Sequence, residues 1–195
     1  RLTLELTANP IWYAVLALPT INTPQTDNVT EITASYYVST LATAIANANP
    51  QITNTIRQWM QKSDATLTSP LEKTPELKSI LLQLSPWVTE AQNETQQMHS
   101  LGELLDVNRQ NYISQQAIDK LAELQNEDGG WSWFKGFNSS TFMTENVLEA
   151  MARLVSLNVT SHPEKVKKMQ IKALQFLDKQ IQESYKHVKT AGYSQ

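Results

Sequence analysis

The residues best suited to chemistry are three pairs of carboxylates, each with its members four positions apart. The pairs are Asp27 with Glu31, Glu90 with Glu94, and Asp119 with Glu123. Residues at i and i+4 share one face of a helix, so each pair could supply the acid and the base that cleave a glycosidic bond. Such pairs also arise by chance on solvated helix faces, and catalysis needs a cleft and a shifted pKa. We therefore interpret the pairs as surface residues.

Metal, nucleophile and phosphate chemistry have little support in the sequence. The three histidines, His99, His162 and His187, do not form a metal-binding motif. The absence of cysteine excludes disulfides, thiolate metal sites, a cysteine nucleophile and a thioester. The Gly-x-Ser-x-Gly, Walker A and Gly-x-Gly-x-x-Gly patterns are also missing. We therefore expect no cofactor and no bound metal.

Residues 121–137, LAELQNEDGGWSWFKGF, gather two of the five tryptophans and three of the five glycines. A helical pattern here runs into an acidic turn. We predict that Gly129 and Gly130 adopt the left-handed backbone that ends the helix. We also predict that the following aromatic residues fill the space between consecutive helices, which favours a structural latch over a ligand platform. These aromatic residues are Trp131, Trp133 and Phe134.

Helical periodicity dominates the chain after a short N-terminal segment. Residues 1–8 alternate between apolar and polar types, which predicts a β-strand, and residues 19–29 form a loop rich in Pro, Thr and Asn. Apolar residues then recur at helical spacing in about seven segments, which predicts an all-α fold of helices packed on helices. Four of the predicted buried stripes are Tyr37, Leu41, Ala44, Ile45 and Ala48; Leu101, Leu104, Leu105 and Tyr112; Met143, Val147, Met151 and Leu154; and Val166, Met169, Ala173, Leu174, Leu177 and Ile181.

Charge gives no strong indication of a polyanionic partner. The net charge is −3, and only 18% of the residues are charged. Seven lysines fall in the predicted helix over residues 164–189, where they could contact a membrane surface or nucleic acid. A solvated outer face is the favoured interpretation, because Lys165, Lys167, Lys168 and Lys172 lie opposite the apolar stripe. We therefore expect no nucleic-acid partner. We also expect no transmembrane segment, because no apolar run approaches the roughly 18 residues of a membrane span.

The spacing Gln125-x-x-x-Gly129-x-Trp131 resembles the repeat motif of the α/α-toroid superfamily. That superfamily includes squalene cyclases, protein prenyltransferases and the thioester domains of alpha-2-macroglobulins and complement proteins. The resemblance implies a toroidal arrangement of helices. The chemistry of the enzyme members is not implied, because the chain lacks both an Asp-x-Asp-Asp acidic cluster and a cysteine that could hold zinc.

A second resemblance covers nearly the whole chain. The segments LTLELTANPIWYAVLALPTI, TEITASYYVSTLATAIANANP, LEKTPELKSILLQLSPWVTEAQNE and LQNEDGGWSWFKG resemble, in this order, the thioester-domain region of bacterial alpha-2-macroglobulin family proteins, particularly the envelope-associated versions of Bacteroides-like bacteria. The resemblance implies that residues 1–18 end a preceding β-domain and that residues 19–195 form part of an α/α toroid. It also implies a longer exported polypeptide, periplasmic or associated with the outer membrane.

The same resemblance implies that the thioester motif is lost. Aligned by helix starts, the Cys-x-Glu-Gln signature falls on Asn28, Thr30 and Glu31. The expected function is a non-catalytic scaffold like that of an endopeptidase inhibitor, with proteases or other domains of the same polypeptide as partners. An α/α-toroid glycan hydrolase or lyase is the alternative, and a pocket with a raised carboxyl pKa at Glu31 or Asp128 beside Trp131 would favour it. A helical-repeat binding module ranks last, because no fixed period of about 30–45 residues is present.

Overall fold

The computed structural model describes residues 18–19, 21–22, 24–61 and 99–190. These residues are mostly helical and contain no sheet, in agreement with the predicted all-α class. Among the described residues, the backbones of Trp131 and Ser140 pair in an isolated antiparallel β-bridge. The strand predicted over residues 1–8 lies outside the described part of the chain.

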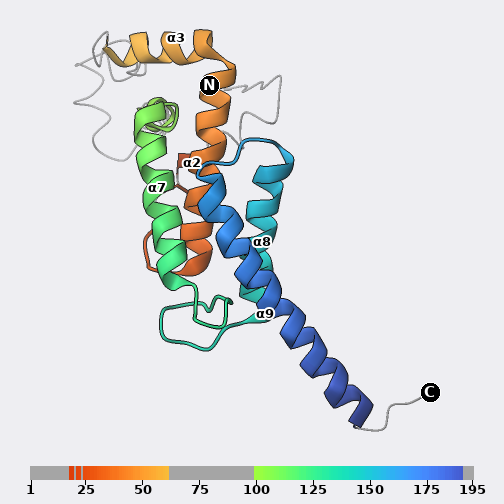
Figure 1. Cartoon of the computed structure of the whole chain (residues 1–195). Helices are drawn as coiled ribbons and strands as arrows, with labels where there is room; N and C mark the ends of the chain where they lie inside the picture. The colour runs from red at the N-terminus through yellow and green to blue at the C-terminus, as the bar shows by residue number, and fades with distance from the viewer. Residues whose placement is uncertain (1–17, 20, 23, 62–98, 191–195) are drawn as a thin grey trace, which may run out of the picture. The chain divides into compact units, whose positions relative to one another are not determined.

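Five helices have defined bounds (Figure 1). Proline occupies the first position of α3 and of α9, where the missing N–H costs no hydrogen bond. The side chain of Asp106 caps the start of α7, because its Oδ1 accepts from the backbone N–H of Asn108 at 2.9 Å. Residues 99–104 are also helical. The bounds are α2 Val29–Ala48, α3 Pro50–Gln61, α7 Val107–Leu124, α8 Thr141–Ser156 and α9 Pro163–Thr190.

Contacts divide the chain into two compact units, the first formed by Arg1–Thr20 and Ala42–Gln110 and the second by Ile21–Leu41 and Asn111–Gln195. In the first unit, Thr53 of α3 donates its hydroxyl to the Ala46 carbonyl at 3.0 Å, which ties α3 to the preceding helical segment. Three leucines of this unit are buried, namely Leu101, Leu104 and Leu105.

The second unit holds a hydrophobic core to which α2, α7, α8 and α9 contribute. Helices α8 and α9 pack against each other and lie side by side in Figure 1. The stripe predicted for α8 is confirmed, since each of its four side chains is at most 1% exposed. The fully enclosed core residues include Val29, Tyr36, Ile118, Leu121, Trp131, Val147, Met151, Leu154 and Ala173.

The stripe predicted for α2 is confirmed only in part, since Tyr37 packs against the core and is half-buried, as are Leu41 and Ala44. Ile45 and Ala48 are exposed, whereas Tyr36 is fully buried together with several hydroxyl residues. The hydroxyl of Thr33 donates to the Val29 carbonyl at 2.7 Å, and that of Ser39 donates to the Ser35 carbonyl at 2.7 Å. A small side chain that bonds to the preceding turn can face a packed interior without an unsatisfied donor. The buried face of α2 is therefore partly polar, and apolar spacing alone cannot locate it.

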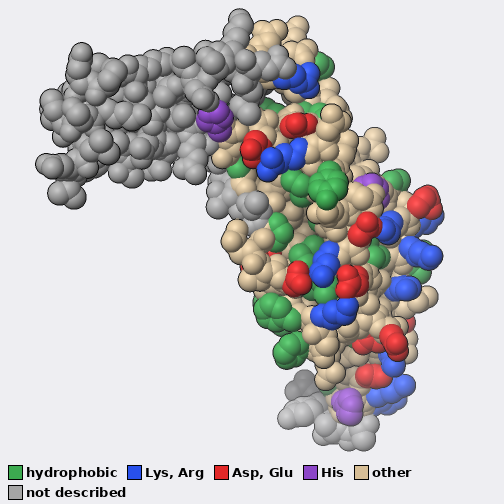
Figure 2. Space-filling model, turned by 90° about the vertical axis from the view of Figure 1, so that its left-hand side faces the viewer, with side chains coloured by type: hydrophobic (Ala, Val, Ile, Leu, Met, Phe, Trp, Pro, Cys, Tyr) green, Lys and Arg blue, Asp and Glu red, His purple; other side chains and the backbone are tan. Residues whose placement is uncertain are grey.

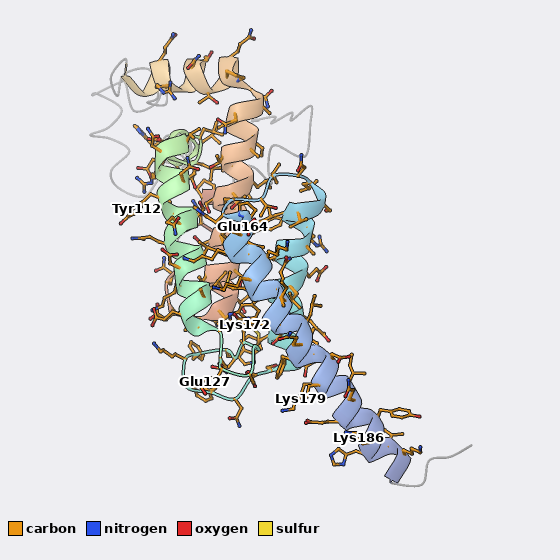
Figure 3. All side chains as sticks on the ribbon, viewed as in Figure 1. Tyr112, Glu127, Glu164, Lys172, Lys179 and Lys186 are labelled. Atoms are coloured by element: carbon orange, nitrogen blue, oxygen red, sulfur yellow. The ribbon has the colours of Figure 1, made fainter. Side chains whose placement is uncertain are left out.

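Three further residues of the predicted stripes lie at the surface. Tyr112 of α7 is 64% exposed and points away from the helices around it in Figure 3. Leu174 and Ile181 of α9 are 58% and 66% exposed, whereas Phe176 is buried in their place. Helix α9 continues past the N-terminal end of α8 in Figure 1, so its last turns extend beyond the described core of the second unit.

No helix of the described ranges combines the length and the apolar character of a membrane span. Acidic and basic side chains are interspersed on the face of the molecule shown in Figure 2. That face therefore presents no single-sign charged surface among its described residues.

The core of the second unit predicts the effect of one substitution in α8. Replacing Met151 by Ala removes a fully buried side chain, so we expect the free energy of unfolding to fall by about 2–5 kcal/mol. Val155 on the same helix is 51% exposed, and Val155→Ala should change that free energy by no more than about 0.5 kcal/mol. Urea denaturation followed by circular dichroism measures both. Equal effects would contradict the assignment of Met151 to the core.

Candidate functional site

Trp131 anchors the segment that joins α7 to α8. Its side chain is fully buried, and its indole N–H donates to the Leu121 carbonyl at 2.9 Å. Its backbone N–H donates to Thr144 Oγ1 at 3.0 Å, and its carbonyl accepts from the backbone N–H of Ser140 at 2.8 Å. Trp131 therefore connects the last turn of α7 to the first turn of α8.

Gln125 joins the same turn to α9. Its side-chain amide donates to the Gly129 carbonyl at 2.9 Å and to the Met169 carbonyl at 3.0 Å. One glutamine thus satisfies acceptors from two segments that are 40 positions apart in the sequence. The Gln-x-x-x-Gly-x-Trp spacing therefore has a local physical explanation, because each of its three residues makes a contact that closes the turn.

The two glycines serve different purposes. Gly129 has φ +92°, a left-handed backbone that favours glycine, and a Cβ there would collide with the backbone carbonyl of Lys172. Gly130 does not adopt a positive φ, contrary to our prediction. A Cβ at Gly130 would lie 2.6 Å from Ser139 Cβ and 2.9 Å from a ring carbon of Phe176. Gly130 therefore permits close packing of the turn on α9.

A polar network supports the turn, and our reading of the sequence missed it. Asp128 Oδ1 accepts from the Gly130 backbone N–H at 3.0 Å and from the Ser139 hydroxyl at 2.6 Å. The side-chain amide of Asn126 donates to the Phe137 carbonyl at 3.1 Å. Ser140 caps α8 by accepting from the Met143 backbone N–H. A serine before an apolar run is a helix-start signal that could have identified this cap.

The start of α2 lies against this turn. Asn28 caps the helix, because its Oδ1 accepts from the Thr30 backbone N–H at 2.8 Å. The backbone N–H of Val29 donates to the Trp133 carbonyl at 3.2 Å. The hydroxyl of Thr30 also lies 4.0 Å from the sulfur of Met143. The start of α2, which the resemblance aligns with a thioester motif, and the aromatic turn are about 100 positions apart in the sequence and meet in one place.

Glu31 stabilises the loop before α2. Its Oε2 accepts from the backbone N–H groups of Thr26 at 3.0 Å and Gln25 at 2.7 Å, and its Oε1 accepts from the Thr26 hydroxyl at 3.1 Å. These hydrogen bonds, that from the Thr26 backbone first, lower the pKa of Glu31 below its usual value. A general acid needs the opposite shift, so the environment of Glu31 suits a capping role.

The other described carboxylates of the predicted pairs are engaged in ion pairs. The pKa of Asp119 is lowered, chiefly by its hydrogen bond from the Lys165 ammonium group. The pKa of Glu123 is lowered, chiefly by its hydrogen bond from Lys135. Asp27 lies 3.5 Å from the ammonium group of Lys120, and Glu90 and Glu94 lie outside the described residues. Among residues that the structure describes, no group of His, Asp or Glu side chains could hold a metal ion.

Trp133 and Phe134 are 47% and 45% exposed, so the prediction that they fill the space between helices is wrong. Trp133 stacks on Phe142, with ring centroids 6.1 Å apart and an interplanar angle of 27°. Phe134 lies beside Phe137 at 6.4 Å and 56°. Phe137 and Phe142 are 65% and 60% exposed. We call these four side chains the exposed aromatic surface.

The two left-handed glycines offer a matched test of the turn. Gly129 and Gly136 have similar φ values of +92° and +89°, but a Cβ at Gly136 meets nothing within 4 Å. We expect Gly136→Ala to lower the free energy of unfolding by about 1–2 kcal/mol through backbone strain alone. Gly129→Ala adds the collision with the Lys172 carbonyl, so we expect about 1–3 kcal/mol more. Urea denaturation measures the difference, and equal losses would refute the close contact.

The lowered pKa of Glu31 predicts a pH-dependent effect. A depressed folded-state pKa stabilises the fold above the unfolded value near 4.5, and this contribution disappears as pH falls through the folded pKa. We therefore expect Glu31→Gln to lower the urea midpoint at pH 7 and to have a smaller effect at pH 3. Glu145→Gln on α8 controls for the loss of one negative charge. A Glu31→Gln effect of equal size at both pH values would contradict the charged cap.

A scan against protein-family models and searches of curated proteins and solved structures find no match. The macroglobulin resemblance therefore stays a prediction.

Proposed function

We propose that the chain is a non-catalytic scaffold that binds other proteins through the exposed aromatic surface, with endopeptidases as the first candidate partners. The observation that carries the proposal is the exposure of four aromatic side chains on one short segment, each between 45% and 65% exposed. Aromatic residues are enriched at protein interfaces, and tryptophan is among the residue types that most often dominate the binding energy.

The backbone that presents these rings is held in place on several sides. The Trp133 carbonyl accepts from the Val29 N–H at 3.2 Å, and the Phe134 carbonyl accepts from the Ser132 hydroxyl at 2.6 Å. The Phe137 carbonyl accepts from the Asn126 side chain. Phe142 belongs to the first turn of α8. A surface that is already ordered loses less conformational entropy on binding, which favours a recognition role.

The glycan hydrolase or lyase alternative has weaker support. It requires a carboxyl group with a raised pKa in an open site beside Trp131. Trp131 is fully buried, and the pKa of Glu31 is lowered. Asp128, the other candidate acid, accepts hydrogen bonds from Gly130 and Ser139 within the turn. These environments favour structural roles for both carboxylates.

Endopeptidases are the proposed partners because of the resemblance to the macroglobulin family. A chain without cysteine cannot form the thioester of that family, so we propose that any trapping is non-covalent. Other domains of a longer polypeptide would compete for the same surface. An exported protein of the periplasm or outer membrane would encounter such proteases, and we propose that location.

The binding test uses the chain with a subtilisin-type and a trypsin-type protease, each blocked covalently at its active-site serine. Biolayer interferometry measures the dissociation constant. We expect the double variant Trp133→Ala/Phe142→Ala to bind at least about tenfold more weakly, because the loss of one interface anchor commonly exceeds 1.4 kcal/mol. Val155→Ala, which removes an exposed side chain of α8 away from the aromatic surface, should bind like the unaltered chain.

Two outcomes would overturn the proposal. In the first, neither protease binds the unaltered chain. In the second, both proteases bind the double variant as tightly as the unaltered chain. Release of reducing ends from a panel of polysaccharides would instead support the enzyme alternative. In that case, Glu31→Gln and Asp128→Asn identify the acid that is required.

A further inference from the structure

Helix α9 carries an apolar stripe that faces solvent. Its exposed apolar residues recur at alternating steps of three and four positions, and Asp178 occupies the stripe position between Leu174 and Ile181. This is the a/d spacing of a coiled coil sustained over nearly three heptads. The exposed members are Ile171 at 49%, Leu174 at 58%, Ile181 at 66%, Tyr185 at 67% and Val188 at 53%.

This stripe is distinct from the face that packs on the core of the second unit. The core-facing side chains of α9 include Val166, Met169 and Ala173, which belong to the core cluster. Every side chain from 181 to 189 is exposed. Helical segments in water depend largely on tertiary packing of an apolar face. The C-terminal half of α9 therefore presents such a face with none of the described residues covering it.

We propose that α9 pairs with α9 of a second copy of the chain, in antiparallel orientation, through this stripe. The proposal concerns a different surface from the exposed aromatic surface and does not depend on the proposed function. Two identical stripes related by a two-fold axis form a closed, self-complementary interface.

The charges at the edge of the stripe favour the antiparallel orientation. Asp178 and Glu183 precede the basic group of Lys186, His187 and Lys189 along the helix. An antiparallel partner places its basic end beside the acidic part of the first helix, and the helix dipoles also oppose each other favourably. A parallel pair would instead set Asp178 against Asp178 at a core position, where like charges repel.

Several registers satisfy the spacing, and the contact of Asp178 with Lys189 selects the one in which residues 178–188 of the two copies face each other. When Ile181 faces Tyr185 of the second copy, Asp178 faces Val188 and lies beside Lys189 of that copy. Both contacts occur twice because of the two-fold symmetry. The centre of the pair then falls near residue 183, so that Gln182 lies close to its own equivalent. Asp178 is separated from its equivalent by about ten residues, or roughly 15 Å along the axis.

A membrane surface fits the stripe less well. Lys172, Lys179 and Lys186 follow each other at seven-residue steps along α9, as Figure 3 shows. At about 100° per residue these lysines lie roughly opposite Ile181 and Leu174. Lysines in these positions are compatible with either surface, but Asp178 lies within the stripe, and insertion of the stripe between lipids would bury its carboxylate without a cation beside it, whereas the helix pair places it beside Lys189.

Crosslinking of single-cysteine variants tests the orientation, because the chain has no cysteine of its own. A short bis-maleimide should link Gln182→Cys to itself and should leave Asp178→Cys and the outward-facing Lys172→Cys unlinked. Linking of Asp178→Cys without Gln182→Cys would overturn the antiparallel arrangement. Linking of Lys172→Cys to the same extent as Gln182→Cys would indicate random collision and would also overturn it.

Sedimentation velocity of the full chain between 1 and about 100 µM tests the pairing itself, over a range where weak homodimers appear. We expect a concentration-dependent dimer that Ile181→Asp abolishes. Asp178→Lys and Lys189→Asp should each weaken dimerisation about tenfold, because two attractive contacts become repulsive, and the double variant should restore it. A monomer throughout this range would overturn the proposal. Binding of the chain to phosphatidylserine vesicles, if the stripe variants abolish that binding, would overturn it as well.

Discussion

The indole of Trp131 closes the core where three segments of the second unit meet. Its N–H donates to the Leu121 carbonyl at the end of α7, while the backbone of the same residue bonds to Thr144 and Ser140 at the start of α8. A fully buried tryptophan contributes a large apolar area to the core and needs a hydrogen-bond partner for its N–H. The Leu121 carbonyl, ten positions earlier in the chain, is that partner. The position of the loop, and with it the contact to the start of α2, follows from this one side chain.

The same loop turns two neighbouring aromatic residues in opposite directions. Trp131 is buried, and Trp133, two positions later, is 47% exposed with its ring stacked on Phe142. The loop therefore separates a stabilising aromatic residue from aromatic residues that are available for recognition. The carboxylates around it, Glu31 and Asp128, accept hydrogen bonds that hold the backbone in position. An arrangement in which the acids support the loop and the rings face solvent is more typical of a binding surface than of a hydrolytic site.

Helix α9 shows a comparable division along its length. Its first half contributes Val166, Met169 and Ala173 to the core, whereas every side chain from 181 to 189 is exposed. The apolar residues of the second half cost free energy in water and have no packing partner among the described residues. The aromatic loop and the end of α9 are thus two separate apolar surfaces, on which the proposed binding and the proposed pairing depend.

The sequence by itself determined the helical class, the stripe of α8, the break after Leu124 and the left-handed glycine at 129, because these depend on local periodicity and backbone sterics. Only the tertiary structure decided which face of α2 is buried, because Ser39 and Thr33 satisfy their hydroxyls within the helix and can then pack like apolar residues. It also decided that Leu174 and Ile181 stay exposed and that Val29 bonds to the Trp133 carbonyl. Burial and long-range hydrogen bonds depend on which segments meet in space, and residue spacing along one helix carries no information about that.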